Sequence, residues 1–511
     1  MPYYLGIDVG TSAVKALLID EKGTIAGSSS HACSLRQPFI GWAEQDPEEW
    51  WTATVAAVKS LLAGGADPGQ IKGIGLTGQM HGLVALDTNH DVLRPAIIWC
   101  DQRTAKEAAA ITSKIGDSRL LNVTGNLALT GFTAAKILWV KNNEPAVFEK
   151  IHKILWPKDY IRFRLSGELS TDISDASATN LLDIRTGKWS REIAGDLGIP
   201  FEYLPPVSNS SELSAKVSAR GAEETGLAMG TPIAGGAGDQ IAGAVGSGIV
   251  QEGLASSVIG SSGVVITQTD KLAIDDRCRV HTFCHAIPGK WCVLGVTQGA
   301  GLSLKWLKEN CCGAEDYLGQ HLGDSPYAIM GREAGRAPVG SQGLIFLPYL
   351  MGERTPHLDP DAKGVFFGIS AKTTHNDLIR AVMEGVAYSL KNCFDLVVQL
   401  GLDVNEVRVS GGGGRSEVWR QIQADVYGCD VTTLVNDEGP SFGAAILAAV
   451  GAGEYAGIQQ ASSHLVRRMD VQKPLTENTK TYRKYYEIYC DLYGLLAEPF
   501  KRLAQITKGG Q

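Results

Sequence analysis

Two segments of the chain have the same form, a β-strand, a Gly-[Ser/Thr]-Ser turn and a second β-strand. The first reads IDVGTSAVKALLI around Gly10 and the second reads SVIGSSGVVITQT around Gly260. The two glycines are 250 residues apart, which is about half of the 511-residue chain. A repeated unit of this kind predicts an ancient duplication of one domain. We therefore expect two related domains, residues 1–248 and 249–511.

Strand and helix signals alternate along both halves, which is typical of an α/β fold. Asp46-Pro47-Glu48-Glu49 has the features of a helix start, with a capping acid, a proline and acids in the first turn. Residues 376–400 read as a long helix that Gly401 ends.

Charge and hydropathy exclude several classes of protein. The net charge of −8 gives no basic face for general nucleic-acid binding. No run approaches the roughly 18 apolar residues of a membrane-spanning helix. The first ten residues read as a β-strand and not as a signal peptide. We expect a cytoplasmic protein without membrane or nucleic-acid partners, and leave its assembly open between a monomer and a homodimer.

The ten cysteines are sparse and form no C-x-x-C pair, as expected of buried thiols in a reducing compartment. One group, Cys278, His281, Cys284 and His285, contains residue types that bind zinc. The apolar residues between them favour a strand, in which alternate side chains face opposite sides. Core packing is therefore the favoured role of this group, with a metal site as the alternative.

Three glycine-rich loops, around Gly10, Gly260 and Gly411, each follow a predicted strand. Glycines let a backbone approach a phosphate closely and expose N–H donors to it. The loops match neither the G-x-x-x-x-G-K-[S/T] sequence of a P-loop nor a strand–G-x-G-x-x-G–helix unit. They indicate phosphate binding of a different type.

Two acidic residues lie beside these loops. Asp8 ends the first strand, and a carboxylate next to a phosphate requires a cation such as Mg²⁺ between them. Lys15 on the next strand could add positive charge there. Asp239 begins a predicted helix after four small residues, where the helix N-terminus favours the ionised form that a general base needs. The alternatives are a turn-capping Asp8, a solvated Lys15 and a helix-capping Asp239.

Several motifs together resemble the FGGY family of carbohydrate kinases. They are Gly6-Ile7-Asp8-Val9-Gly10-Thr11-Ser12, Gly78-Gln79-Met80-His81-Gly82, Gly238-Asp239-Gln240, Gly352-Glu353-Arg354-Thr355-Pro356 and the glycine run at residues 411–414. The likeness extends from residue 3 to about residue 450. Within the family, the Gln-Met-His-Gly turn is similar to that of the branch acting on D-xylulose.

The resemblance implies an actin-like, ribonuclease H-like fold, with two domains of five-stranded mixed sheets around a central cleft. It also implies a kinase that uses ATP and Mg²⁺, with the sugar bound mainly by the first domain and ATP by the second. Asp239 would be the catalytic base and Asp8 the carboxylate that holds Mg²⁺ through water. The sugar site would contain Met80, His81, Asp101 and Gln240. Phosphate and nucleotide contacts would come from Thr11, Ser12, Lys15, Gly260, Ser261, Gly301, Lys305, Gly412 and Gly413.

Three other functions stay open at this point. One is a kinase of the same family that acts on another pentulose or on a polyol. A second is an actin-like ATPase without sugar chemistry, because one fold supports many functions. The Asp239 loop and the Met80-His81 turn argue against it, since such an ATPase needs no sugar pocket. The third, an NAD-dependent enzyme, lacks its dinucleotide motif.

Overall fold

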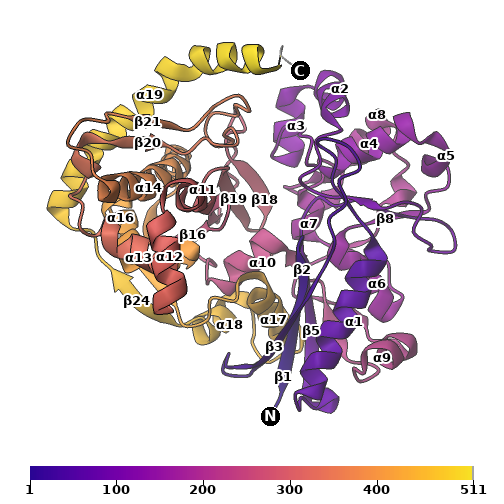
Figure 1. The fold of residues 1–511 in the computed structure, drawn as a ribbon. Helices are drawn as coiled ribbons and strands as arrows, with labels where there is room; N and C mark the ends of the chain where they lie inside the picture. The colour runs from indigo at the N-terminus through magenta and orange to yellow at the C-terminus, as the bar shows by residue number, and fades with distance from the viewer. Residues whose placement is uncertain (509–511) are drawn as a thin grey trace.

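Two mixed β-sheets with flanking helices make up the protein. The computed structural model describes residues 1–508, without the side chains of residues 320, 322 and 508. Figure 1 shows the first half of the chain, indigo to magenta, beside the second half, which runs to yellow at the C-terminus. The strands of the first sheet lie in the order β13 (Leu213–Lys216), β14 (Pro232–Ala234), β5 (Ile71–Gly78), β1 (Tyr3–Val9), β2 (Ala13–Asp20) and β3 (Ile25–Ala32), with β15 (Ala237–Gly238) also paired to β5.

The second sheet repeats this arrangement. Its strands lie in the order β18 (His281–Cys284), β19 (Trp291–Thr297), β17 (Gly263–Thr269), β16 (Gly253–Ile259), β22 (Val404–Gly411), β23 (Asp430–Leu434) and β24 (Arg468–Gln472). In each sheet the first hairpin is antiparallel and its first strand pairs in parallel with the next long strand, β5 or β22. The predicted repeat is thus confirmed. We expected five strands in each sheet, and each sheet has seven. The expected five strands are the core that the two sheets share.

The two hairpin turns have the same closing hydrogen bond. The Gly10 N–H donates to the Ala13 carbonyl at 3.0 Å, and the Gly260 N–H donates to the Ser262 carbonyl at 3.0 Å. The second turn is one residue tighter, since Ile259 pairs with Gly263 whereas Val9 pairs with Val14. Both turns lie at the end of a central strand, where loop N–H groups are available to a ligand.

Helices cover the faces of both sheets, and their ends follow the sequence signals. The Asp46 side chain accepts the Glu48 N–H and caps α1, and Thr374 forms a capping box at the start of α14. The principal helices are α1 (Pro47–Ala63), α2 (Ala105–Ile115), α4 (Thr133–Asn143), α6 (Pro157–Ser166), α10 (Asp239–Gly246), α11 (Gly301–Cys311), α12 (Gly313–Leu322), α13 (Pro326–Ala334), α14 (His375–Gln399), α16 (Glu417–Tyr427), α17 (Gly439–Gly451) and α19 (Thr476–Lys508).

Helix α17 belongs to the second half in sequence but packs on the first sheet, against β1 and β5. A Cβ atom on Gly75 would lie 1.8 Å from the Ala444 carbonyl oxygen, so only glycine permits this approach. The same helix crosses α10, where a Cβ atom on Gly443 would lie 1.8 Å from the Ala242 carbonyl oxygen. The two halves are therefore joined backbone to backbone at this crossing.

In the part of the chain that the structure describes, none of the helices combines the length and apolarity needed to cross a bilayer.

Candidate active site

A cavity of about 200 Å³ lies between the two halves. It brings together five of the residues predicted from the sequence, Thr11, Met80, His81, Asp239 and Gln240. The other residues that line it are Trp99, Phe132, Ser262, Val264, His281, Phe283, Leu294, Val296 and Arg354. The cavity thus has walls from both halves and touches both glycine turns, through Thr11 and Ser262.

Asp239 is the first residue of α10 and directly follows β15. Its Oδ1 accepts the Gln240 N–H at 2.8 Å, which fixes the carboxylate at the cavity wall. Burial raises the pKa of Asp239 to about 6, against the hydrogen bond from Gln240, which lowers it. A carboxylate with this pKa is ionised at neutral pH and still basic enough to accept a proton from a hydroxyl group.

Asp8, at the end of β1, pairs in register with Lys15 of β2 and Thr77 of β5. Its Oδ1 is buried and has no hydrogen-bond partner among the described residues. Burial, and next the charge of Asp239, raise the pKa of Asp8 to about 7, while Lys15 opposes the shift. Two carboxylates in one low-dielectric place, one with a free oxygen, fit a site for an oxygen-seeking cation such as Mg²⁺.

His81 forms one wall of the cavity and has a positive φ of 68°. Its Nδ1 lies 2.7 Å from the Ala178 carbonyl oxygen, and its ring stacks on Phe132 with centroids 4.6 Å apart. Burial, with the nearby Lys136 charge, lowers the pKa of His81 well below its usual value. The ring is therefore neutral with its proton on Nδ1, which leaves Nε2 as an acceptor for a hydroxyl group.

The first glycine turn is held by a chain of side-chain hydrogen bonds. Trp99 Nε1 donates to Thr11 Oγ1 at 3.0 Å, and Thr11 Oγ1 donates to Gln79 Oε1 at 3.2 Å. Gln79 Nε2 then donates to Gln45 Oε1 at 2.7 Å. Ser12, the next predicted phosphate contact, is exposed at the tip of the turn. These hydrogen bonds hold the turn beside β1, the strand that contains Asp8.

Two of the residues predicted for the site, Lys15 and Asp101, form ion pairs with other side chains of the protein. Lys15 pairs with Glu438 at the start of α17, so its charge links the two halves. Asp101 is fully buried, bonds to the guanidinium of Arg103 at 2.7 Å and does not line the cavity. The Arg103 ion pair gives Asp101 a structural contact, and its part in the sugar site stays a prediction.

A larger cavity, of about 750 Å³, lies in the second half. It brings together the predicted nucleotide-site residues Gly260, Ser261, Gly301, Lys305, Gly412 and Gly413. Its remaining walls come mainly from α13 and α16, with Tyr327, Arg332, Val418 and Trp419 among them. Lys305 is exposed, and its Nζ lies 3.7 Å from Glu309. Six of the nine residues predicted for phosphate and nucleotide contacts therefore share one cavity, whereas Thr11 lines the smaller cavity and Ser12 and Lys15 line neither.

The glycines of this cavity differ in whether the surrounding protein leaves space for a side chain at their position. A Cβ atom on Gly301 would lie 2.4 Å from the Gly260 carbonyl oxygen, so Gly301 is required for packing. A Cβ atom on Gly260 or Gly412 would meet its nearest protein atom only at 3.6 or 3.7 Å. The protein itself does not need glycine at these two positions. Without a side chain, both glycines leave the cavity wall open to the close approach of a ligand.

The aromatic side chains of the smaller cavity and Arg354 are site residues that the sequence did not predict. Phe132 lies 5.8 Å from the His281 ring, centroid to centroid, and Arg354 adds a buried guanidinium from the second half. The sequence contained only a partial indication of these residues. Arg354 belongs to one of the motifs that resemble the family, whereas packing was the favoured role of His281. Cys278 Sγ lies 3.9 Å from His281 Nδ1. Cys284 and His285 instead bond to backbone carbonyls, as packed strand residues do.

The chain is similar to known proteins over almost its whole length. Residues 3–246 match the model of the N-terminal domain of the FGGY family of carbohydrate kinases, and residues 255–452 match that of its C-terminal domain. A xylulose kinase of Escherichia coli is 40% identical over 88% of this chain and 90% of its own length. One of Bacillus subtilis is 37% identical over 96% and 97%. The crystal structure of a xylulose kinase from Rhodospirillum rubrum superposes with a TM-score of 0.89 at 31% identity, covering 98% and 100%.

Proposed function

The chain belongs to the FGGY family of carbohydrate kinases, and from this membership we propose that it phosphorylates D-xylulose with ATP to give D-xylulose 5-phosphate. The observation that supports this most is the composition of the smaller cavity. One cavity contains a carboxylate able to act as base, a neutral histidine and residues of both glycine turns. A phosphoryl acceptor bound there lies between its base and the loops that would hold the phosphate donor.

In the proposed reaction Asp239 accepts the proton of the terminal hydroxyl group. The hydroxyl oxygen attacks the γ-phosphorus, the bond to the bridging oxygen of ADP breaks, and ADP leaves with the electron pair. Phosphoryl transfer depends mainly on such in-line positioning and on charge stabilisation. The His81 Nε2 acceptor and the Gln240 amide would orient the sugar hydroxyl groups in the cavity they line.

Asp8 would hold the Mg²⁺ ion that accompanies ATP. Its unpartnered, buried Oδ1 is an oxygen donor of the type this ion prefers. The bound ion would offset the charge of the phosphates. Thr11, Ser12 and Lys15 would then serve the phosphate end from the first half, while Gly260, Ser261, Gly412 and Gly413 line the nucleotide cavity in the second.

The smaller cavity also limits the access of water to the reacting groups. Its apolar and aromatic side chains, with Phe132, Phe283 and Leu294 among them, form a part of the lining that cannot hydrogen-bond a hydrolytic water. Closure of the halves about the α10–α17 crossing would exclude water further, which protects the phosphoryl group from hydrolysis. All ten cysteines are free, which fits the proposed location in the reducing cytoplasm.

The test is ADP release from Mg-ATP in a coupled assay, with D-xylulose, D-ribulose, glycerol and D-gluconate as separate acceptors. We expect strong stimulation by D-xylulose and little by the others. D-Gluconate is included because the Arg354 guanidinium in the cavity could pair with a carboxylate. Stimulation by another acceptor alone would overturn the choice of sugar. Equal turnover without any acceptor would overturn the kinase assignment in favour of an ATPase.

A further inference from the structure

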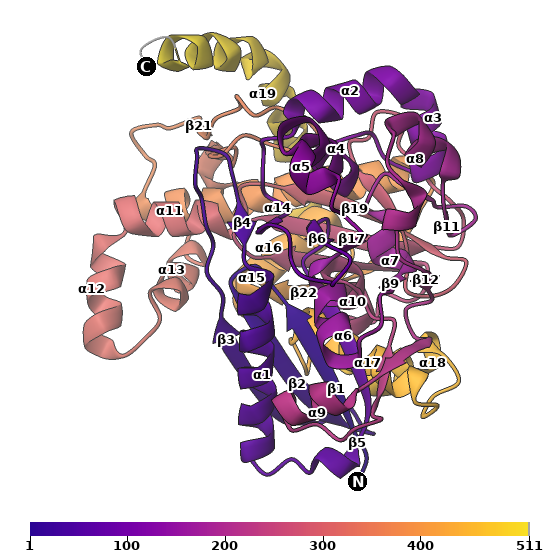
Figure 2. The same ribbon diagram turned by 90° about the vertical axis from the view of Figure 1, so that its right-hand side faces the viewer.

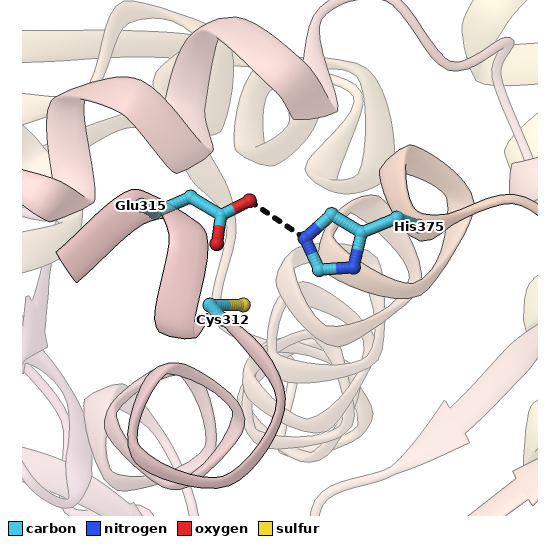
Figure 3. Close-up of side chains that lie close together, drawn as sticks. All are labelled: Cys312, Glu315 and His375. Carbon is cyan, nitrogen blue, oxygen red and sulfur yellow. Dashed lines mark hydrogen bonds and ion pairs between the residues drawn. The ribbon is translucent and has the colours of Figure 1, made fainter. Parts of the chain in front are cut away.

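Three side chains with metal-binding atoms meet at a place outside both cavities. Cys312 joins α11 to α12, Glu315 lies in the first turn of α12, and His375 begins α14 (Figure 3). One ligand atom from each residue lies within 4.8 Å of the other two. Cys312 and Glu315 are buried, whereas the His375 side chain is 40% exposed. The place is thus reached from solvent on one side only.

The cluster contains more acceptors than donors. Glu315 Oε1 bonds to His375 Nε2 at 2.8 Å, but Glu315 Oε2 is buried without a hydrogen-bond partner among the described residues. Glu333 of α13 directs its carboxyl group at that of Glu315, and its Oε2 is also buried without a partner. Two adjacent carboxyl groups are stable only if a proton or a cation lies between them. The Glu315 side chain is 4% exposed, so water does not fill this role freely.

The type of donor decides which cation fits. A thiolate, an imidazole and a carboxylate are the ligands of tetrahedral zinc, whereas Mg²⁺ and Ca²⁺ select oxygen alone. We infer that Cys312, Glu315 and His375 form a zinc-binding site, with the fourth position open to solvent beside His375. Zn²⁺ displaces the Cys312 thiol proton and any proton held between the two glutamates, and these protons pass to solvent.

The proposed ligands lie outside the nucleotide cavity, whose wall is formed in part by the neighbouring helix α13. Helix α13 supplies Tyr327 and Arg332 to that wall, and Glu333 is the next residue. Helices α12 and α13 stand out from the body of the second half (Figure 2). A metal ion bound to Cys312, Glu315 and His375 would anchor α12 to the start of the long buried helix α14. Its role would be structural, because it lies apart from the loops assigned to the phosphates.

The test is a titration of the full-length protein, stripped with a chelator, by Co²⁺ as a spectroscopic substitute for Zn²⁺. We expect one ion per chain, a thiolate-to-metal charge-transfer band, the intense visible bands of tetrahedral Co²⁺, and displacement by one equivalent of Zn²⁺. Cys312→Ser should abolish the charge-transfer band. Cys311→Ser, which changes the exposed neighbouring thiol, should leave it intact.

A second variant keeps the test decisive if Cys312→Ser does not fold. His375→Ala alters a partly exposed side chain and should weaken Co²⁺ binding roughly 10- to 100-fold or more. Absence of stoichiometric binding, a weak octahedral spectrum without sulfur coordination, or undiminished affinity in His375→Ala would overturn the inference. The cluster would then be a Glu315–His375 ion pair with a proton shared by the glutamates. The result does not depend on any kinase assay.

Discussion

The two hairpins that begin the two sheets share one backbone arrangement, but one has charged side chains where the other has apolar side chains. In the first hairpin Asp8 faces Lys15 across the pair, and at the matching register of the second, Val258 faces Val264. Both hairpins keep the glycine turn and its closing hydrogen bond. The hairpin with its glycine turn thus occurs twice, and only the first copy has charged side chains at this register. Catalysis in such a molecule is expected to be asymmetric, with the reacting groups in one half and the nucleotide pocket in the other.

The strongest test of this asymmetry is removal of the base from the first half. Asp239→Asn keeps the size of the side chain and its position at the start of α10. We expect kcat to fall about 10³-fold, within the range for loss of a general base, while calorimetry shows D-xylulose binding within a few-fold of the parent. A kcat within tenfold of the parent would show that the base lies elsewhere.

The second largest effect is expected from removal of the Asp8 charge, which distinguishes the two hairpins. Asp8→Asn should lower kcat roughly 10²-fold and raise the Mg²⁺ concentration needed for half-maximal rate, because the metal loses an anionic ligand. Val258→Ala, at the equivalent position of the other hairpin, is the matched control and should change kcat less than about twofold. Similar losses in both variants would contradict the asymmetry.

A smaller effect is expected from the glycine of the second turn. Gly260→Ala adds a methyl group that the empty protein accommodates, since its nearest neighbour is 3.6 Å away. The nucleotide would meet this methyl group, so the KM for ATP should rise about tenfold with little change in that for the sugar. Gly195→Ala, on a surface helix with open space around it, is the control for the substitution itself. An unchanged KM for ATP would place the nucleotide away from Gly260.

The smallest effect concerns stability and pH. In the folded protein the pKa of Asp8 is about 7, against 3.8 for the ordinary group. Between these values the folded state binds more protons than the unfolded state, so unfolding free energy falls as pH rises and levels off above pH 7. Without metal or nucleotide, Asp8→Asn should raise Tm by roughly a few °C at pH 8 and leave it unchanged near pH 4. An equal difference at both pH values would rule out titration of Asp8 as its cause.

The sequence was informative wherever a feature is local. The hairpins, the Asp46 cap and the grouping of Met80, His81 and Asp239 in one cavity follow from short motifs. Contacts between distant residues were not predictable in this way. Lys15 pairs with Glu438, 423 residues further along, and Arg354 enters the cavity from the other half. Such contacts depend on how the halves pack, which no periodicity or spacing encodes.

Asp101 illustrates a different limit. The family resemblance assigned it to the sugar site, and in the structure Arg103 forms a bidentate ion pair with it and stacks over the Trp42 ring at 3.5 Å. A motif indicates which polar groups a segment carries. It does not indicate which of them a neighbouring side chain has already neutralised.

The packing of α17 on the first sheet has a consequence for the order in which the molecule is made. The strands β1 and β5 leave the ribosome early, but the helix that covers them consists of residues 439–451. At about 5–20 residues per second, more than 350 further residues must be added first, which takes on the order of tens of seconds. During that time the nascent sheet exposes an apolar face that chaperones would be expected to shield. A gene cut at residue 248 would leave this face exposed permanently, so the half-protein should aggregate when it is expressed alone and recover when the second half is co-expressed.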